Sequence, residues 1–432
     1  MRAFWAADID LIEDIMARFH LNIRIICREA VALLLLLSAV GAYAQRPADL
    51  KYYDVQELGL PILGKVFENT GNPFSRLPQD LKGVIRKEVW QLGQNSAGLA
   101  IRFSTNSSAI AIRWDLISGF VMHHMTGIGI RGLDLYTLVE GKWLYVGAAQ
   151  PYKVDGGESS RNCRSMVRKN IEPLKNSRGE QIGDGSREYL LYLPLYDGIE
   201  KLSIGIDSTA SITKPRSGNL LPGKSGKPVV FYGTSVTQGG CATRPGMAYT
   251  NIISRERQIE VVNLGFSGNG RMDKLLADKI AKMDARAIFL DCLGNCTYKI
   301  IKDSADYFIR TIASADPQRP LYLVSNYAYA YQYIDRNFRS DLDAENSLWY
   351  SLYLKFRKEG FKNVKFVNLS GGRIGPEIAD AIESGAPRSG EPTGGNLEKS
   401  PCGPDHEGSV DGVHLTDIGF QRVAKEFMKH IK

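Results

Sequence analysis

The sequence has no long hydrophobic run, no dense basic block and no second Cys/His pair beside its two closest cysteines, and each absence argues against a class of protein. The longest apolar run lies within residues 31 to 44, which is shorter than the roughly 20 residues that a membrane-spanning helix needs. The formal net charge is only +7, without clustered Lys/Arg and interleaved aromatics, which argues against nucleic-acid binding. Cys292 and Cys296 stand alone, so their spacing does not predict a zinc site.

The N-terminus is typical of an export signal. Arg24 and Arg28 precede the apolar run, which ends in Ala42-Tyr43-Ala44, the small-x-small pattern that signal peptidase cleaves. We therefore predict a signal peptide over residues 1–44 and a mature protein in the periplasm or outside the cell. Residues 1–15 carry acidic side chains ahead of a segment that should begin basic, so we interpret them as an over-extended start.

The rest of the chain changes its pattern once, which predicts two domains. Residues 45–222 contain short runs of alternating apolar and polar residues. We interpret them as three β-hairpins, which turn at residues 105–108, at Glu140-Gly141 and at Asp197-Gly198. This pattern favours an all-β sandwich of jelly-roll type. The Pro-, Gly- and Ser-rich residues 214–228 are typical of a linker.

Residues 223–432 alternate strands with helices. The runs PVVFYG, IEVVNLG, RAIFLDCLG, PLYLVSN and VKFVNLS are apolar and rich in β-branched residues, and helical stretches such as RMDKLLADKIAKMD separate them. Such alternation predicts a parallel sheet covered by helices on both faces, a three-layer α/β/α domain. In such a sheet the functional residues follow the carboxyl ends of the strands.

The loop after the first of these strands, GTSVTQGGCATRPG, presents a serine. A Walker-type phosphate loop needs Lys after its last glycine, where this chain has Cys241, and a G-x-S-x-G elbow needs glycine where it has Thr237. A flavin-binding loop of flavodoxin type is harder to exclude. The remaining interpretation is Ser235 as a nucleophile, near a helix that we expect to begin around Gly246 and whose N–H groups could stabilise an oxyanion.

A serine nucleophile needs a base, and the chain has only six histidines. Two of them, His406 and His414, lie in the second domain outside its last helix. In VDGVHLTDIGF, Asp411 stands three residues before His414, so one turn can bring its carboxylate to the imidazole. Taken alone, this D-x-x-H is more often a surface turn.

Two further strand ends supply candidate oxyanion donors. Gly265 ends one strand, and its N–H can approach a substrate because no Cβ intervenes. Asn295 follows the next strand and offers a neutral side-chain amide. Separately, such residues usually just turn or cap the chain.

The order Ser235, Gly265, Asn295, His414 resembles the SGNH branch of the GDSL esterase/lipase superfamily over residues 228–432. The resemblance implies a flavodoxin-like fold, with Ser235 as nucleophile and oxyanion donor, Gly265 and Asn295 as further donors, His414 as base and Asp411 as its partner. Thr234 departs from the usual G-D-S. The mature chain is similar to a bacterial secreted subgroup in which a sandwich precedes the hydrolase.

These residues predict a secreted serine esterase that works by two-step acyl transfer and requires no metal or cofactor. We expect its substrate to be an acetylated carbohydrate, with no nucleic-acid partner and no membrane span after cleavage. The alternatives are an esterase, lipase or thioesterase on small lipid-like esters, an inactive glycan-binding protein, and a flavodoxin-like electron carrier.

Several residues are candidate substrate contacts. Thr234 and Gln238 flank the nucleophile. His123 and His124 lie between methionines in VMHHMTG and could reach the active-site cleft. The plainer interpretation of each histidine is a hydrogen-bonded side chain near a strand end. Aromatic residues of the sandwich could bind sugar but are more often core. They are Trp90, Trp114, Trp143 and Tyr145.

Five cysteines remain after the predicted cleavage, and an odd number leaves at least one thiol free. Cys241 follows the nucleophile loop and Cys402 precedes the catalytic histidine, so we weigh a disulfide that joins these two loops. The other three are Cys163, Cys292 and Cys296. The Gly- and Pro-rich residues 373–408 are long for a loop and are expected to be mobile or to wall the cleft.

Overall fold

The computed structural model describes residues 49–431 except 152–160, 216–225, 371–399 and 404. The predicted signal peptide and most of the 373–408 loop lie outside the described residues. No helix in the described ranges is long and apolar enough to span a membrane. Residues Leu50–Lys432 form one compact unit, so the sandwich and the α/β layers are parts of a single body.

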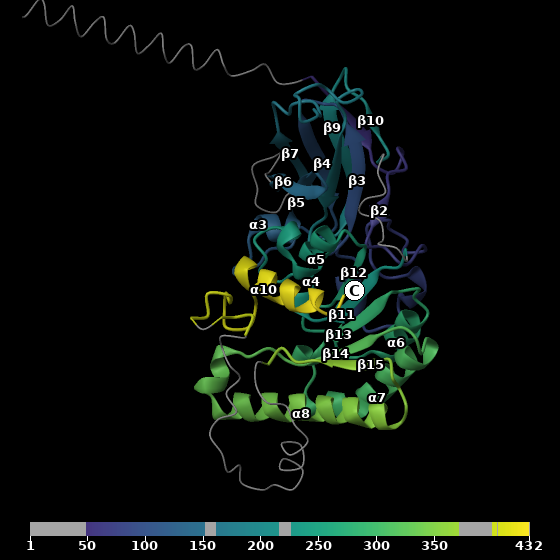
Figure 1. Cartoon of the computed structure of the whole chain (residues 1–432), viewed down its shortest axis with the longest axis vertical. Coiled ribbons are helices and arrows are strands. Elements are labelled where there is room, and N and C mark those ends of the chain that lie inside the picture. The colour runs from purple at the N-terminus through teal and green to yellow at the C-terminus, as the bar shows by residue number, and fades with distance from the viewer. Residues whose placement is uncertain (1–48, 152–160, 216–225, 371–399, 404, 432) are drawn as a thin grey trace, which may run out of the picture. The chain divides into compact units, whose positions relative to one another are not determined.

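Two antiparallel sheets make up the N-terminal part (Figure 1), as predicted for an all-β sandwich. Their inner faces enclose a core of large apolar side chains that includes Phe103, Trp114 and Leu191. The four-stranded sheet consists of β1 (Leu50–Asp54), β9 (Ile199–Asp207), β4 (Ile110–Leu116) and β7 (Asn162–Arg168). The second sheet consists of β10 (Ile212–Thr213), β3 (Ala100–Thr105), β8 (Arg187–Tyr192), β5 (Leu133–Val139) and β6 (Lys142–Ala149), with β2 (Ile62–Leu63) paired to β3.

Only one of the three expected hairpins forms. Strands β5 and β6 pair antiparallel around Glu140 and Gly141, which both adopt positive φ as a tight two-residue turn requires. The other two expectations were wrong, because β3 and β4 lie in different sheets, as do β8 and β9. An alternating pattern indicates that a strand has one buried face, but it does not tell whether the next strand pairs beside it or crosses the core.

The N-terminal part also contains short helices that the sequence analysis did not predict. They are η1 (Gln79–Leu81), α2 (Lys87–Gly93) and α3 (Gly127–Arg131). Leu81 and Val89 from the first two pack into the same cluster as strand β12 and helix α6 of the C-terminal part, whose bounds are given below. This segment therefore covers the hydrolase sheet and not the sandwich.

A five-stranded parallel sheet forms the centre of the C-terminal part, in the order β12-β11-β13-β14-β15. Its strands are the five predicted apolar runs: β11 (Val229–Gly233), β12 (Val261–Gly265), β13 (Ala287–Asp291), β14 (Leu321–Val324) and β15 (Val364–Val367). Every residue of β11, β12 and β13 is buried, which explains why their sequences are continuous and not alternating. The three-layer prediction is confirmed.

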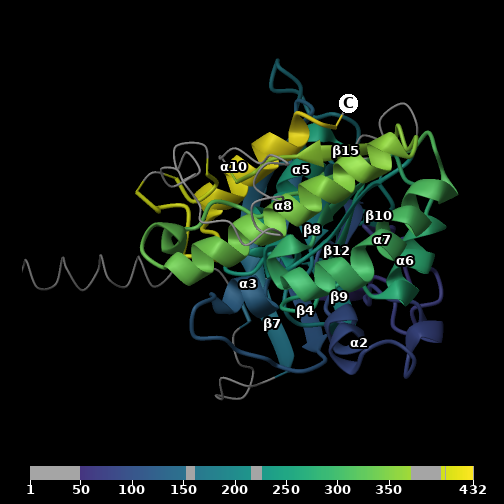
Figure 2. The same cartoon turned by 90° about the horizontal axis from the view of Figure 1, so that it is seen from below.

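Helices cover both faces of this sheet. Helices α5 (Tyr249–Arg257) and α10 (Asp417–Met428) pack on the face that carries Phe231 and Phe289. Helices α6 (Lys274–Ala281), α7 (Tyr298–Ala315) and α8 (Arg336–Lys358) pack on the face that carries Tyr232 and Leu290, and Figure 2 shows α8 crossing beneath the sheet. A fourth 3-10 turn, η4 (Ala330–Tyr333), precedes α8.

The sandwich and the hydrolase layers share a hydrophobic core. Met125, Ile130, Leu195 and Tyr196 of the N-terminal part belong to the same buried cluster as Phe231. The expected boundary near residue 222 is therefore a change of architecture within one compact unit. As a result, loops of the sandwich reach the carboxyl ends of the parallel strands.

Candidate active site

The candidate nucleophile stands on a sharp turn at the end of β11. Ser235 is the first residue of the one-turn helix α4 (Ser235–Gln238) and is 7% exposed. The Thr234 hydroxyl accepts a hydrogen bond from Val236 N–H, and Thr237 Oγ1 accepts one from Thr234 N–H, which forms a capping box. The helix thus begins at the serine itself. A helix near Gly246 was expected, and the 3-10 turn η2 (Pro245–Met247) and then α5 from Tyr249 form there, but the first turn that holds Ser235 belongs to α4.

Ser235, His414 and Asp411 form a continuous hydrogen-bonded chain. Ser235 Oγ lies 2.9 Å from His414 Nε2, and His414 Nδ1 lies 2.8 Å from Asp411 Oδ2. Asp411 Oδ1 also accepts from the backbone N–H groups of Val413 and His414 at 3.0 and 2.7 Å. A tautomer with the proton on Nδ1 leaves the Nε2 lone pair facing the serine.

The environment of Asp411 favours its ionised form. Burial raises the pKa of this carboxyl, but the hydrogen bonds from the His414 ring and from the backbone outweigh burial and hold the pKa below its usual range. Tyr331 anchors the turn by donating from its hydroxyl to Asp411 O at 2.6 Å. The carboxylate is therefore placed to orient the imidazole and to stabilise an imidazolium.

The expected oxyanion donors are only partly available. Within the described residues, Ser235 N–H has no hydrogen-bond partner, as an oxyanion donor requires. Asn295 lies at the end of η3 (Leu293–Asn295), where its Oδ1 accepts from Gly270 N–H at 3.2 Å. Its Nδ2 donates to Gly294 O at 3.2 Å, which leaves its second amide hydrogen for an oxyanion. Gly265 does not fit the predicted role, because its N–H donates to Asn263 Oδ1 at 2.9 Å.

Gly265 instead permits close packing. A Cβ at this position would lie 2.2 Å from Gln238 N, so only glycine allows β12 to approach the nucleophile helix so closely. Asn263, also in β12, stabilises this close packing, because its Nδ2 donates a hydrogen bond to Thr237 O of α4 at 2.6 Å. The glycine therefore determines where α4 lies.

Sequence reasoning missed Gly268, three residues further along the chain. Gly268 adopts φ +66° with open space around its Cα, and its N–H has no partner in the described part of the chain. Its loop folds back over β11, where Phe266 N–H donates to Gly233 O at 3.0 Å, and reaches Asn295 through Gly270. The repeated glycines of GFSGNG were the available signal, but they do not tell which N–H stays free.

A buried carboxylate supports the nucleophile helix from beneath. Asp291 Oδ2 accepts hydrogen bonds from Thr237 Oγ1 at 3.0 Å and Tyr249 OH at 2.8 Å, and Tyr327 OH lies 3.0 Å away. Burial raises the pKa of Asp291 to about 6, although these hydrogen bonds oppose the increase. The sequence analysis did not single this residue out.

Two of the expected substrate contacts are structural. Gln238 is fully buried, with Nε2 donating to Leu195 O and Oε1 accepting from Ser267 N–H, both at 3.0 Å, so its amide is not available to a substrate. The Thr234 side chain caps α4 and is 6% exposed. Both predictions were wrong for the same reason, since these side chains satisfy backbone groups of the fold.

His123 and His124 do reach the site from the sandwich. They lie in the loop between β4 and α3, with ring centroids 4.7 Å apart, and the His124 ring is 5.6 Å from the His414 ring. Cys241 lies in the same region, and one nitrogen of each of His124 and His414 and the Cys241 sulfur are within 4.8 Å of one another. Among the described side chains this is the group suited to hold a metal ion.

The disulfide between Cys241 and Cys402 is contradicted, because none of the five cysteines in the described ranges forms a disulfide, and all five are buried.

Trp114 and Trp143 are core residues, as the plainer interpretation held, and Trp90 is partly buried. Tyr145 is 48% exposed, but the Arg244 guanidinium stacks 4.0 Å above its ring. Thus these aromatics do not form an open platform for sugar.

An ion pair joins the sandwich to the loop after the nucleophile helix. Asp134 of β5 is fully buried, and its Oδ2 accepts from Arg244 Nη1 at 2.6 Å and from Gly246 N–H at 2.9 Å. Arg244 Nη1 also lies 2.5 Å from Tyr136 OH. Asp134 and Tyr136 belong to the sequence Gly-Leu-Asp-Leu-Tyr at 132–136, which therefore docks the two halves beside the active site.

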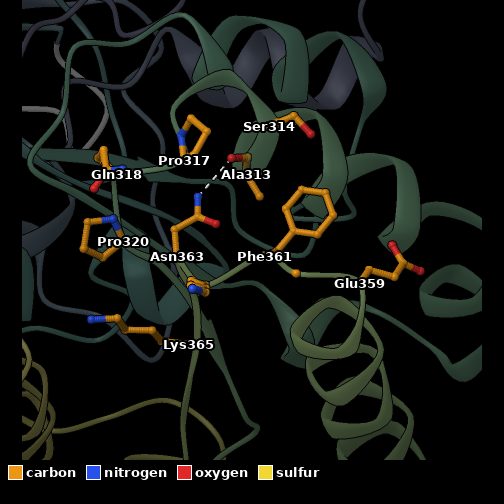
Figure 3. A pocket seen from close by; sticks show the side chains of 11 residues that line it. Ala313, Ser314, Pro317, Gln318, Pro320, Glu359, Phe361, Asn363 and Lys365 are labelled. Carbon is orange, nitrogen blue, oxygen red and sulfur yellow. Dashed lines mark hydrogen bonds between the residues drawn. The ribbon is translucent and has the colours of Figure 1, made fainter.

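A pocket of about 600 Å³ lies in another part of the C-terminal region. Figure 3 shows side chains that line it. Its lining residues include Ala313, Pro320 and Phe361, which precede β14 and β15, together with Asn363, whose Nδ2 donates to Ala313 O at 2.9 Å. It opens at the amino ends of the parallel strands, whereas Ser235 follows a carboxyl end. The pocket is therefore separate from the candidate active site.

The fold places a hydrogen-bonded Ser-His-Asp chain, the arrangement that serine hydrolases use, at the carboxyl edge of a three-layer α/β/α sheet that follows a β-sandwich. Comparisons with known proteins agree. Residues 50–212 match a family model described as the GxDLY N-terminus of SGNH-hydrolase-type esterases, and residues 226–384 match the GDSL-like lipase/acylhydrolase family. A comparison with curated proteins finds no match.

Solved structures extend the similarity to nearly the whole chain. A crystal structure described as a GDSL-like lipase from Bacteroides ovatus is 30% identical, with a TM-score of 0.72, and the match covers 89% of this chain and 97% of that one. The salicylyl-acyltransferase SsfX3 of a tetracycline biosynthetic pathway is 16% identical with a TM-score of 0.59, over 89% of this chain and 98% of that one, which shows a common fold. The chain belongs to the GDSL-like lipase/acylhydrolase family, and this membership supports hydrolysis of carboxylic esters.

Proposed function

We propose that the protein is an exported serine esterase that removes small acyl groups, above all O-acetyl groups, from a carbohydrate. The observation that carries the proposal is the hydrogen-bonded chain from Ser235 Oγ through His414 to Asp411 at the carboxyl edge of the parallel sheet. Export rests on the sequence of the first 44 residues.

In the first half of the reaction, Ser235 Oγ attacks the ester carbonyl while His414 Nε2 takes the hydroxyl proton. The oxyanion receives hydrogen bonds from Ser235 N–H, Asn295 Nδ2 and Gly268 N–H, which replaces Gly265 in this role. The intermediate then collapses to an acyl-serine, and His414 passes its proton to the leaving alcohol. Losing one such donor typically costs about a hundredfold or more in rate.

In the second half, His414 removes a proton from water, which attacks the acyl-serine. The second tetrahedral intermediate expels Ser235 Oγ, which regains a proton from the imidazolium, and the carboxylic acid is released. The Asp411 carboxylate stabilises the imidazolium in both halves without taking its proton.

The surroundings of the site support a small acyl group on a hydroxylated alcohol. The neighbouring side chains of His123, His124 and Asn295 are polar, and they can hydrogen-bond sugar hydroxyls. One observation favours a more lipid-like ester as the second candidate: Phe120 and Val121, on the same loop as His124, are 46% and 57% exposed.

The test is ester cleavage by the mature chain, residues 45–432, on acetylated polysaccharides and on p-nitrophenyl esters of increasing acyl length. We expect acetate release that is lost in Ser235→Ala and in His414→Ala. A matched control is His430→Ala, because the His430 ring packs against Tyr322, 5.5 Å away, and not at the site.

The acyl-length series separates the candidates. A preference for acetyl groups on polysaccharide supports the proposal, whereas a rate that rises with acyl length supports the lipid-like substrate. Wild-type protein that binds glycan but cleaves no ester would contradict an enzymatic role.

A further inference from the structure

Three ligand-forming side chains converge beside the nucleophile from distant parts of the sequence. His124 comes from the loop after β4, Cys241 from the turn after α4, and His414 from the loop before α10. One nitrogen of each histidine and the Cys241 sulfur lie within 4.8 Å of one another. The acyl-transfer steps use His414 alone, so two members of the group have no role in them.

Each of those two members has a property that hydrolysis does not explain. His124 Nδ1 is buried and has no hydrogen-bond partner among the described residues, although a buried polar atom without a partner is costly. Cys241 adopts φ +71°, a left-handed conformation that is strained for a residue with a side chain. Both properties are consistent with side chains held in place to bind a ligand.

The donor set indicates which ligand fits. Two imidazole nitrogens and one thiolate suit Zn²⁺ and similar borderline cations, whereas Mg²⁺ and Ca²⁺ prefer oxygen. Cys241 binds the ion as a thiolate, so its proton is released when the ion binds, which an ion with high affinity for sulfur favours. Tetrahedral bonds of about 2.1 Å to nitrogen and 2.3 Å to sulfur place ligand atoms about 3.5 Å apart, so side chains now within 4.8 Å of one another must move closer when the ion binds.

We propose that His124, Cys241 and His414 bind Zn²⁺ and that this binding inhibits the esterase. His414 Nδ1 faces Asp411, so the metal takes the Nε2 lone pair. That lone pair is the one that receives the Ser235 proton, and a nitrogen bound to zinc cannot accept it. The inhibition rests on the proposed function of His414, but the binding does not. Asp411 then acts as the outer partner of a metal-bound histidine, an arrangement that orients the ring and strengthens its donation.

Binding is tested first by spectroscopy in a protein that cannot hydrolyse esters. Co²⁺ added to metal-free Ser235→Ala should produce thiolate-to-cobalt charge-transfer absorption at one equivalent, and Zn²⁺ should remove it. The absorption should be absent after the added change Cys241→Ala and retained after Cys163→Ala, because Cys163 is a buried cysteine of the sandwich core. No such absorption in Ser235→Ala, or its survival without Cys241, would overturn the proposed site.

Inhibition is tested next with p-nitrophenyl acetate and metal-free wild-type protein. We expect Zn²⁺ to abolish activity, a chelator to restore it, and Mg²⁺ and Ca²⁺ to have no effect. Cys241→Ala should retain basal activity and need at least about ten times more Zn²⁺ for half inhibition, while Cys163→Ala behaves as wild type. Equal sensitivity of wild type and Cys241→Ala contradicts the proposal.

A second variant covers the event that Cys241→Ala fails to fold. His124→Phe keeps a ring and removes both nitrogens, and it should weaken Zn²⁺ binding by a similar factor in the spectroscopic titration. If the wild type has no esterase activity but the cobalt titration behaves as expected, the metal site stands and the proposed function fails.

Discussion

The ion pair between Asp134 and Arg244 offers a sharp test of how the sandwich is joined to the active site. Arg244→Met removes the guanidinium and keeps much of the side-chain volume. Asp134 then remains fully buried, and the hydrogen bond from Gly246 N–H at 2.9 Å is what remains to stabilise its charge among the described hydrogen bonds. Its Oδ1 already has no hydrogen-bond partner among the described residues. The variant therefore leaves a poorly compensated buried charge.

The magnitude follows from burial. Breaking a buried ion pair typically costs about 3–5 kcal/mol, and the 23% exposure of the Arg244 side chain places this pair near about 3 kcal/mol. The double variant Asp134→Asn/Arg244→Met removes both charges and should lose only about 1–2 kcal/mol. We therefore expect a strong coupling between the two changes, since the double variant should lose about 1–2 kcal/mol less than Arg244→Met alone.

Thermal and denaturant unfolding of the four proteins measures this coupling. For a chain of this size about 3 kcal/mol corresponds to a fall of roughly 3–6 °C in Tm. Burial raises the pKa of Asp134, and Arg244 opposes that increase, so in Arg244→Met the pKa rises further. At a pH above this raised pKa, the buried Asp134 carboxylate is charged and destabilises the variant. As the pH falls below the pKa, the carboxylate takes up a proton, so the difference in free energy of unfolding between variant and wild type should become smaller in acid. Additive effects, or a gap that widens in acid, would refute the reasoning.

Three further predictions concern the nucleophile helix and the thiols. Gly265→Ala should lower Tm and reduce kcat about a hundredfold, because its Cβ would meet the backbone of α4. In Gly268→Ala the Cβ meets open space, so only the strain of alanine at φ +66° remains, which should cost about 1 kcal/mol of stability. Circular dichroism and ester kinetics compare the two variants, and an equal loss of Tm would contradict the packing argument. As the pH falls from 7 to 4, wild type should gain up to about 3 kcal/mol of stability relative to Asp291→Asn, because a carboxyl with a raised pKa of about 6 binds its proton more tightly in the folded protein. Urea unfolding measures this difference, and a difference that does not change with pH would count against the prediction. All five cysteines of residues 45–432 should react with a thiol reagent after denaturation without reductant, because none forms a disulfide in the structure. A disulfide-linked pair found by peptide mapping would contradict this prediction.

The parallel layers were predictable because each strand is a continuous apolar run between helices, and a parallel sheet buries both faces of its strands. The same logic located Ser235, since functional residues follow the carboxyl ends of such strands. Asp411 and His414 were predictable together because one turn of backbone brings their side chains into contact, and the structure places Asp411 Oδ2 2.8 Å from His414 Nδ1.

Other features depend on contacts that a single sequence does not reveal. The pairing of β3 and β4 depends on whether the chain turns within one sheet or crosses the core, and both courses give the same alternation. Whether Gly265 or Gly268 keeps a free N–H depends on the side chain of Asn263, whose Oδ1 accepts from Gly265 N–H. Gln238 looked like a substrate contact from its position, but the hydrogen bonds at both ends of its amide make it part of the framework.

The architecture explains why a sandwich precedes this hydrolase without serving as a separate module. Tyr196 OH, from the N-terminal part, lies 3.3 Å from Ser235 O, and Arg76, also from the N-terminal part, donates to Gly265 O at 2.8 Å from a buried position. Both bonds end on residues that determine where α4 lies, so the N-terminal part positions Ser235 as directly as the parallel sheet does. Its loop also places His124 against His414. A metal held by both halves would then couple their docking to the state of the catalytic base, because neither half alone supplies all three ligands.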